Sequence, residues 1–212
     1  PIIGETVVLT IDIELQKFIE ELFQEYNGAI GVVDLKTGGI LAMVSTPNFN
    51  PEIFSGVTEK EQWDALINDP AKPLHNKFIQ GLYLPGSTFK VVMALAALQE
   101  NMIQSSTTSL CSGAINIYDR QFHCGNRGGH GNMDLYEALA FSCNIYFYRL
   151  GKRMDIDTIA DYAKMMGLGH ATNIDLPNEK AGMFPTREWK QRVLKQKWFA
   201  GETVSVAIGG GM

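Results

Sequence analysis

The sequence contains no long apolar run, no cluster of basic residues and few cysteines. No stretch reaches the roughly 18 apolar residues that a membrane-spanning helix needs. The net charge is -5 at pH 7, and the absence of a basic stripe argues against a nucleic-acid partner. With 45% hydrophobic and 19% charged residues, the 212-residue chain has ordinary globular composition. Its length suffices for one sizeable domain or two small ones.

The spacing of hydrophobic residues predicts a mixture of helices and strands. We expect an extended entry at residues 5–10, then a helix from an N-cap at Asp12 to Tyr26, with its apolar side chains in the core. Apolar runs at 29–34 and 40–45 flank a glycine-containing turn and predict a β-hairpin. Further helices are expected at residues 59–67, 87–100, 134–141, 145–152, 156–166 and 186–192, and from about 202.

The segment 84–90 reads Leu-Pro-Gly-Ser-Thr-Phe-Lys and opens a strongly apolar helix. Positions i and i+3 share a helix face, so Lys90 can lie beside the hydroxyl of Ser87. A serine nucleophile needs an adjacent base, and burial lowers the pKa of a lysine towards that role. The same pattern also fits a serine N-cap followed by a solvated lysine. Since no other charge occurs before Glu100, and a lone buried charge needs a partner, a catalytic pair is favoured.

A second polar element, Ser142-Cys143-Asn144, begins 55 residues after Ser87 and interrupts two predicted helices. A hydroxyl at such a junction can relay a proton, and an amide can hold a substrate carbonyl. An ordinary polar break between helices is the alternative interpretation.

Together these motifs resemble those of the penicillin-binding transpeptidases, in which Pro-Gly-Ser-Thr-Phe-Lys is followed at this distance by Ser-x-Asn. Residues 4–16 resemble the entry to their transpeptidase domain, and residues 34–43 resemble its first hairpin. Segments 185–190 and 201–203 resemble the class B, elongation-specific branch, the penicillin-binding protein 2 group. The resemblance covers essentially the whole chain.

The resemblance implies an α/β (α+β) fold of the penicillin-binding transpeptidase and β-lactamase-like type, with a helical lobe packed on an antiparallel sheet. It implies a D,D-transpeptidase in which Ser87 attacks D-Ala-D-Ala stem peptides of peptidoglycan, and β-lactams acylate the same serine. Lys90 would be the general base, Ser142 a proton relay and Asn144 a substrate-binding amide. Expected partners are the rod-shape elongation machinery and a glycosyltransferase, at the periplasmic side of the inner membrane.

The family's third motif, Lys-Ser/Thr-Gly on a later strand, has no counterpart after Ser-x-Asn. Lys36-Thr37-Gly38 matches the letters but precedes Ser87, so we expect it to form a hairpin turn without a catalytic role. The chain begins with Pro1 rather than Met. We therefore expect residues 1–212 to be an incomplete transpeptidase domain that lacks its C-terminal strands, a membrane anchor and an N-terminal domain.

All three cysteines lie between residues 111 and 143, close to a histidine. Cys111, Cys124, His130 and Cys143 make up a Cys3His set, a common composition of structural zinc sites. Some elongation-specific members of the family resemble this chain in having a zinc site around the Ser-x-Asn loop, so we expect structural zinc here. A Cys111–Cys124 disulfide or inert buried thiols are the alternatives.

Two other functions remain open. A β-lactamase or β-lactam sensor of the same superfamily would share Ser-x-x-Lys, although it would not be expected to carry the long entry segment. The missing third motif also leaves room for a non-catalytic binding fragment.

Overall fold

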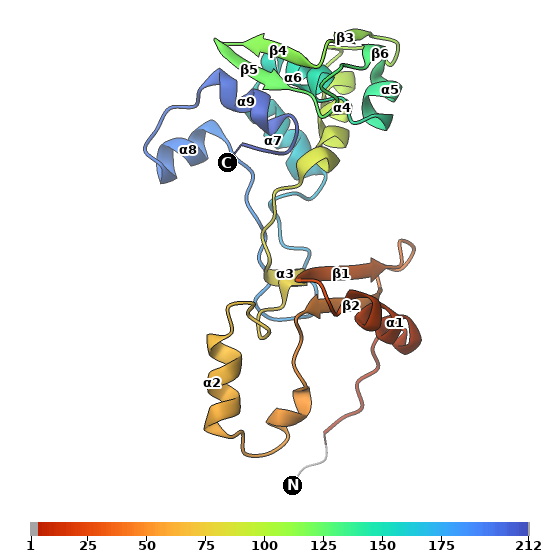
Figure 1. Cartoon of the computed structure of the whole chain (residues 1–212), viewed down its shortest axis with the longest axis vertical. Helices are drawn as coiled ribbons and strands as arrows, with labels where there is room; N and C mark the ends of the chain where they lie inside the picture. The colour runs from red at the N-terminus through yellow and green to blue at the C-terminus, as the bar shows by residue number, and fades with distance from the viewer. Residues whose placement is uncertain (1–3, 212) are drawn as a thin grey trace. The chain divides into compact units, whose positions relative to one another are not determined.

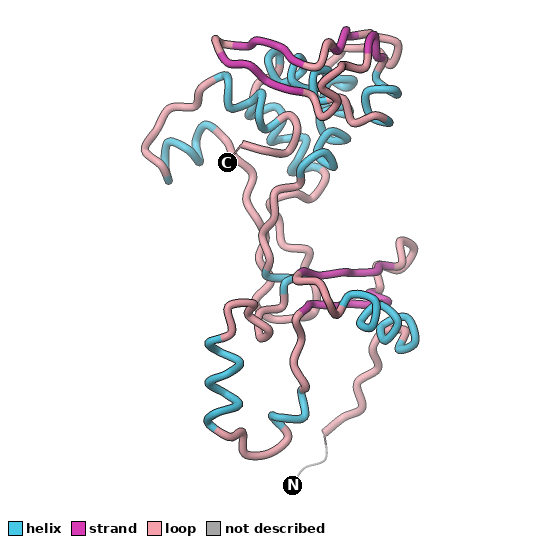
Figure 2. Tube along the Cα trace, in the orientation of Figure 1, coloured by secondary structure: helices cyan, strands magenta, loops and turns pink. Residues whose placement is uncertain are grey.

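The structure, a computed structural model, describes residues 4–211. Pro1 and Met212, which bear on the expected incompleteness of the domain, lie outside this range. The described chain forms two compact units (Figures 1 and 2). One contains the residues up to Leu82 together with Asp175–Lys180, and the other contains Tyr83–Ile174 and the segment from Ala181 onward. Across residues 4–211, no helix combines the length and apolar character needed to cross a membrane.

The first unit is built on a β-hairpin and the helix that covers it. β1 pairs antiparallel with β2, with Gly28 opposite Thr46, which confirms the predicted hairpin. The preceding helix packs on β2, and buried Ile19, Ala42 and Val44 form a small core between them. The elements are α1 Ile13–Phe23, β1 Gly28–Val33, β2 Ile40–Thr46, η1 Pro51–Phe54, α2 Lys60–Asn68 and α3 Lys77–Gln80.

Two expectations for this unit were wrong. Residues 5–10 contain no regular helix or strand, which is compatible with the expected extended entry, but α1 ends at Phe23 rather than Tyr26. The expected core packing of the apolar helix side chains also fails for Phe18 and Leu22, which are 61% and 65% exposed. A two-stranded hairpin offers a narrow surface, so only one face of α1 finds cover. Asp12 is the N-cap as predicted, since its carboxylate accepts hydrogen bonds from two backbone amides in the first turn.

The Lys-Thr-Gly sequence at 36–38 lies in the hairpin turn, as predicted. The Asp34 carboxylate accepts hydrogen bonds from the Lys36 backbone amide at 3.0 Å and from the Thr37 hydroxyl at 2.7 Å. These contacts close the turn locally, as Asp side chains commonly do. The motif therefore has a structural explanation that needs no catalytic role.

The second unit is mostly helical and contains two short antiparallel strand pairs, the hairpin β4–β5 and the pair β3–β6 that encloses it in the sequence. Its core is formed by the buried face of α4 together with α5, α6, α7 and α9. Figure 1 shows the strand pairs at one end of this unit, where they contact α6. The elements are η2 Gly86–Phe89, α4 Lys90–Gln99, β3 Ser109–Cys111, β4 Ala114–Ile117, β5 Arg120–His123, β6 Gly131–Met133, α5 Leu135–Ala140, α6 Asn144–Arg153, α7 Ile156–Met165, α8 Arg187–Val193 and α9 Ala200–Val206.

Local signals located these helices well but misjudged the start of α4. The predicted capping box at Asp134 is present, with reciprocal hydrogen bonds between Asp134 and Glu137. The helix expected from Ser87 begins instead as a 3-10 turn and becomes α-helical at Lys90. One face of α4, including Val91 and Leu95, is exposed, so the helix is not buried all round. Helices and antiparallel strands together confirm the predicted fold class.

Candidate active site

Ser87 lies in the exposed 3-10 turn that leads into α4. The turn is fixed from both sides of this residue. The Thr88 hydroxyl donates to the Pro85 carbonyl at 2.7 Å, and the buried Phe89 ring packs against Phe184 with centroids 5.5 Å apart. The serine hydroxyl is thus presented to solvent from an anchored backbone, as a nucleophile requires.

Lys90 is the first residue of α4 and is only 1% exposed. Its Nζ donates hydrogen bonds to the Ser142 carbonyl at 2.8 Å, the Ser142 hydroxyl at 2.9 Å and Asn144 Oδ1 at 2.7 Å. An ammonium has three donors, and each has an acceptor here. Burial lowers the pKa of Lys90 below its ordinary value. The two motifs predicted from the sequence therefore meet at this nitrogen, which contacts the second motif rather than the Ser87 hydroxyl.

Ser142 occupies an unusual backbone conformation between α5 and α6. Its φ is 51°, in the left-handed region that non-glycine residues seldom adopt. The Cys143 amide donates to the Ala138 carbonyl at 2.8 Å, which closes the end of α5. The strained turn directs both the carbonyl and the hydroxyl of Ser142 to Lys90. Strained residues of this kind cluster at functional sites.

Asn144 is held at both ends of its amide. Its Oδ1 faces Lys90, and its Nδ2 donates to the His123 carbonyl at 3.3 Å. Tyr148 donates to the same carbonyl at 3.5 Å. No sequence motif pointed to this carbonyl. The alternation of apolar residues in 114–123 was the available signal for the β4–β5 hairpin that places it.

Cys111, Cys124, His130 and Cys143 come together beside this site. Their ligand atoms all lie within 4.8 Å of one another, and the three cysteines are free and buried. The Cys111 and Cys124 sulfurs lie 3.6 and 3.5 Å from His130 Nδ1. Tetrahedral zinc with the usual bond lengths would separate a sulfur from a nitrogen ligand by about 3.5 Å. The donor set and its spacing fit such an ion, and the alternative Cys111–Cys124 disulfide is not formed.

Short strands hold this cluster together. β3 pairs with β6, which places Cys111 opposite Gly131. The His130 amide donates to the Cys111 carbonyl at 3.1 Å, and a Cβ at Gly129 would lie 2.4 Å from that oxygen. Only glycine permits so close a backbone approach. Burial raises the pKa of the Cys143 thiol to about 12. Because metal ligation requires the thiolate, binding a cation would release a proton here.

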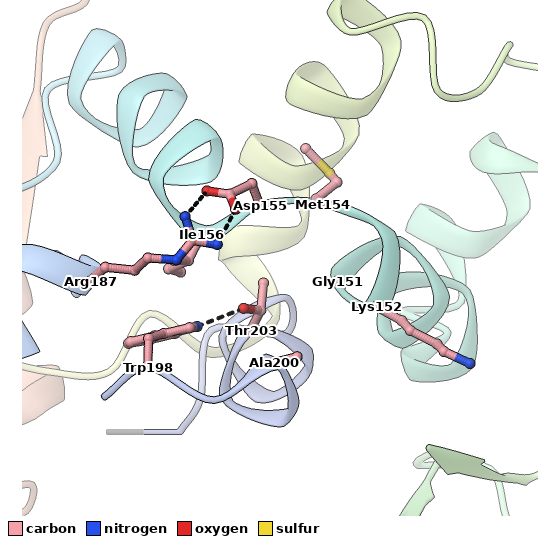
Figure 3. A pocket seen from close by; sticks show the side chains of 9 residues that line it. All are labelled: Gly151, Lys152, Met154, Asp155, Ile156, Arg187, Trp198, Ala200 and Thr203. Atoms are coloured by element: carbon pink, nitrogen blue, oxygen red, sulfur yellow. Dashed lines mark hydrogen bonds and ion pairs between the residues drawn. The ribbon is translucent and has the colours of Figure 1, made fainter. Parts of the chain in front are cut away.

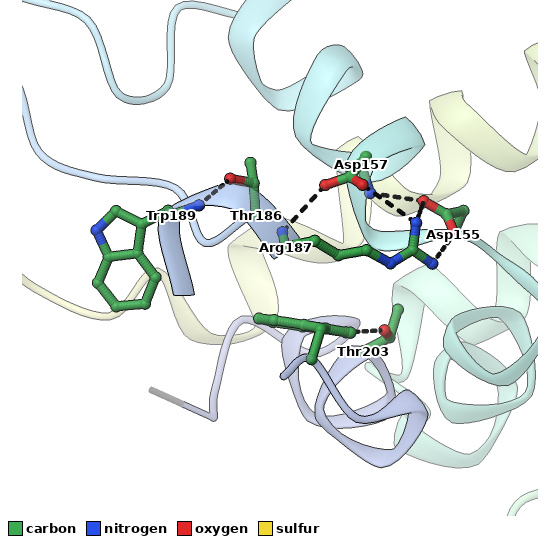
Figure 4. Close-up of polar contacts among 7 residues, drawn as sticks. Asp155, Asp157, Thr186, Arg187, Trp189 and Thr203 are labelled. Carbon is green, nitrogen blue, oxygen red and sulfur yellow. Dashed lines mark hydrogen bonds and ion pairs between the residues drawn. The ribbon is translucent and has the colours of Figure 1, made fainter. Parts of the chain in front are cut away.

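A separate pocket of about 200 Å³ lies where α6, α7, α8 and α9 meet (Figure 3). Arg187 closes one side through ion pairs to Asp155 and Asp157 (Figure 4), and Trp198 donates from Nε1 to Thr203 at 2.8 Å (Figure 3). None of its lining residues belongs to the Lys90 site or the cysteine cluster. The contacts tie the segment around α8 to the helical core.

An exposed serine, followed one turn later by a buried lysine that contacts a second serine and an amide, is the layout of Ser-x-x-Lys acyl-transfer sites. Residues 28–212 match the penicillin binding protein transpeptidase domain, and the chain belongs to that family. It is 38% identical over 213 residues to the peptidoglycan D,D-transpeptidase MrdA of Escherichia coli strain K12, covering 100% of this chain and 34% of the relative. It is 40% identical to MrdA of Haemophilus influenzae, covering 98% and 32%.

Solved structures agree with this assignment. The complex between penicillin-binding protein PBP2 and MreC from Helicobacter pylori matches with a TM-score of 0.92 and 35% identity, over 95% of this chain and 38% of that one. PBP2 of Pseudomonas aeruginosa in complex with WCK 5153 matches with a TM-score of 0.91 and 34% identity, over 97% and 47%. The chain spans about a third of the length of the curated relatives it matches.

Proposed function

We propose that the chain carries the nucleophile of a peptidoglycan D,D-transpeptidase, and that both compact units belong to one transpeptidase domain. The observation that carries this proposal is the meeting of Ser-x-x-Lys and Ser-x-Asn at Lys90 Nζ, with all three contacts at 2.9 Å or less. The similarity to proteins named peptidoglycan D,D-transpeptidase supports the substrate class.

In the proposed reaction, the Ser87 oxygen attacks the carbonyl carbon of the D-Ala-D-Ala peptide bond. Lys90, in its neutral form, takes the hydroxyl proton. Burial lowers the pKa of this lysine, which makes the neutral form more accessible than it is for a solvated lysine. The carbon–nitrogen bond breaks, and the proton reaches the departing D-alanine amine through the Ser142 hydroxyl, which lies 2.9 Å from Lys90 Nζ. An ester on Ser87 remains.

The second half of the reaction transfers the acyl group to an amine of a neighbouring stem peptide. That amine loses a proton along the same route in reverse, and the Ser87 oxygen leaves as a hydroxyl. Asn144 would bind the substrate amide through the second hydrogen of its Nδ2, since the first is donated to the His123 carbonyl. A β-lactam would acylate Ser87 in the same way but lacks a separate leaving amine, so its ester would persist.

Zinc is proposed as a structural ion held by Cys111, Cys124, His130 and Cys143. The close spacing of these four ligand atoms supports the assignment. When bound, zinc would supply structural cross-linking only. Cys143 lies between Ser142 and Asn144, so its ligation would restrain the turn that presents both residues to Lys90.

We also propose partners and a location on the basis of the relatives. The longer protein would act at the periplasmic side of the inner membrane, on stem peptides and with the rod-shape elongation machinery. That machinery would include a glycosyltransferase, and a partner of the MreC type is favoured by the H. pylori complex.

The acylation proposal is tested with a fluorescent penicillin and mass mapping of the labelled peptide. A stable adduct on Ser87 is expected, absent from Ser87→Ala and retained in Ser105→Ala, an exposed serine of the same unit. Rapid hydrolysis of the penicillin would indicate a β-lactamase instead. The absence of any adduct would favour a non-catalytic fragment and overturn the proposal.

Elemental analysis of tag-free protein tests the zinc proposal separately. About one zinc per chain is expected for a Cys3His site. Metal-free protein with two oxidised cysteines would overturn it.

A further inference from the structure

The backbone of Gly209 lies directly against the turn that precedes the proposed nucleophile. Gly209 follows α9, and its carbonyl accepts a hydrogen bond of 3.1 Å from the amide of Gly86, the residue before Ser87. Gly209 is buried. A residue distant in the sequence therefore contacts the backbone from which the serine projects.

The contact leaves no room for a side chain at this position. A Cβ at Gly209 would lie 2.0 Å from the Gly86 carbonyl oxygen and 2.6 Å from its amide nitrogen. Both are backbone atoms, so neither can swing aside as the end of a flexible side chain would. The φ of Gly209 is also +70°, a conformation that disfavours any substituted residue. Any larger residue would have to displace the Ser87 turn or move itself away.

The other end of this connection is fixed against the helix that begins with Asn144. A Cβ at Gly151 in α6 would lie 2.7 Å from the Ala207 side chain and 2.9 Å from the Thr203 carbonyl. Figure 3 shows Gly151 beside the helix that carries Thr203. Because the backbones of α6 and α9 are in close contact at Gly151, the segment after α9 is held in a fixed position relative to Asn144.

We propose that Gly209 is a positioning residue that sets the Ser87 turn relative to Lys90 and Asn144. Its carbonyl holds the Gly86 amide, and its missing side chain allows the approach. The inference rests on the proposed role of Ser87 as nucleophile. Misplacement of a reacting group by about 1 Å can cost roughly 100-fold in rate, so a backbone shift here would be felt in acylation.

Gly209 also has an ordinary role that must be separated from this one. Its amide donates to the Val206 carbonyl at 2.8 Å, as expected of a glycine that ends a helix. Gly167 does the same after α7, with φ +86° and a bond of 2.8 Å to the Lys164 carbonyl, but a Cβ there would meet nothing within 4 Å. Gly167→Ala thus imposes the backbone strain of a substituted residue at a helix end, without a steric clash. Gly210→Ala controls for the neighbouring position, where the nearest atom is 3.7 Å away.

The experiment measures three quantities in the wild-type chain and the three alanine variants. These are the rate of Ser87 acylation by a fluorescent penicillin, the melting temperature and the hydrogen exchange of the Gly86 amide by NMR. In Gly209→Ala we expect acylation to slow about 100-fold and Gly86 exchange to accelerate at least about tenfold. Gly167→Ala should lower the melting temperature less than Gly209→Ala does, because it adds helix-end strain without the clash, and it should keep the wild-type acylation rate and Gly86 exchange. Gly210→Ala should match wild type.

Wild-type acylation and Gly86 exchange in Gly209→Ala would overturn the inference. Equal loss of acylation in Gly167→Ala would reduce Gly209 to a helix-ending residue. If Gly209→Ala does not fold, hydrogen exchange of the wild-type protein still tests the inference. An unprotected Gly86 amide would contradict its hydrogen bond to the Gly209 carbonyl. If wild type forms no adduct, the proposed function fails, whereas unchanged Gly86 exchange on substitution would refute only the positioning role.

Discussion

Replacing Asn144 by alanine removes one of the three oxygen acceptors of a buried ammonium. A hydrogen bond to a charged group contributes about 1.5–3 kcal/mol to stability, and the contact from Lys90 to Asn144 is the shortest of the three, at 2.7 Å. The amide also donates to the His123 carbonyl, a neutral bond that contributes about 1 kcal/mol. We therefore expect Asn144→Ala to lower the free energy of unfolding by about 2.5–4 kcal/mol near neutral pH.

The loss should depend on pH in a defined direction. Burial already holds the pKa of Lys90 below its unfolded value, and removal of an acceptor lowers it further. A folded-state pKa below the unfolded one means that stability rises with pH between the two values. The unfolded chain titrates alike in both proteins, so the cost of Asn144→Ala should be largest while Lys90 is charged in both folded proteins and should shrink as the pH rises through its lowered folded-state pKa.

Urea denaturation in a double-mutant cycle isolates the Lys90 contribution. Lys90→Met removes the charge, so Asn144→Ala in that background should cost only the His123 bond. Asn116→Ala, an exposed asparagine of the same unit, should leave stability unchanged. Equal costs with and without the Lys90 ammonium, or a cost independent of pH, would refute the view that Asn144 stabilises a buried charge.

Three further predictions concern the metal cluster and the ties around α8 and α9. Cys111→Ser should reduce bound zinc from about one per chain to near zero, and full retention by elemental analysis would exclude Cys111 as a ligand. Burial opposes ionisation of Asp155, yet Arg187 holds the pKa of this carboxyl below its usual value, so the stabilisation is lost as pH falls through the lowered pKa. Arg187→Ala should therefore lower the melting temperature at neutral pH more than at about pH 2, and a loss equal at both pH values would contradict this. Glu202→Ala leaves Lys190, which is 4% exposed, without its carboxylate and should lower the free energy of unfolding by about 3 kcal/mol. As a control, Glu188→Ala removes an exposed ion pair with Arg192 and should lower it by less than about 1 kcal/mol. Equal losses in urea denaturation would contradict a stabilising role of the buried pair.

Local features of this fold could be read from the sequence because they depend on neighbouring residues. Asp12 and Asp134 cap helices through amides two or three positions away. The hairpin of β1 and β2 follows from two apolar runs around a polar turn. The exposure of Phe18 could not be predicted in this way, since helical spacing shows which residues share a face but not whether another element covers that face.

The cysteine cluster was only partly accessible from sequence. Composition and family resemblance selected four residues whose side chains the fold brings together, but their spacing matches no common finger pattern. The strand pairing between β3 and β6 and the close approach at Gly129 bring Cys111 and His130 together. Those pairings join segments about 20 residues apart, with strands of three residues each, too short to give a clear periodic signal.

The sequence by itself determined that Lys90 follows Ser87 by one turn at the start of an apolar helix, because residues three apart in a helical turn share a face whatever surrounds them. The tertiary structure decided what Lys90 contacts. Its three acceptors come from Ser142 and Asn144, more than 50 residues away, and they reach it only because α4 packs against α6 and Ser142 adopts a left-handed backbone. Such contacts depend on long-range packing, which no local pattern encodes.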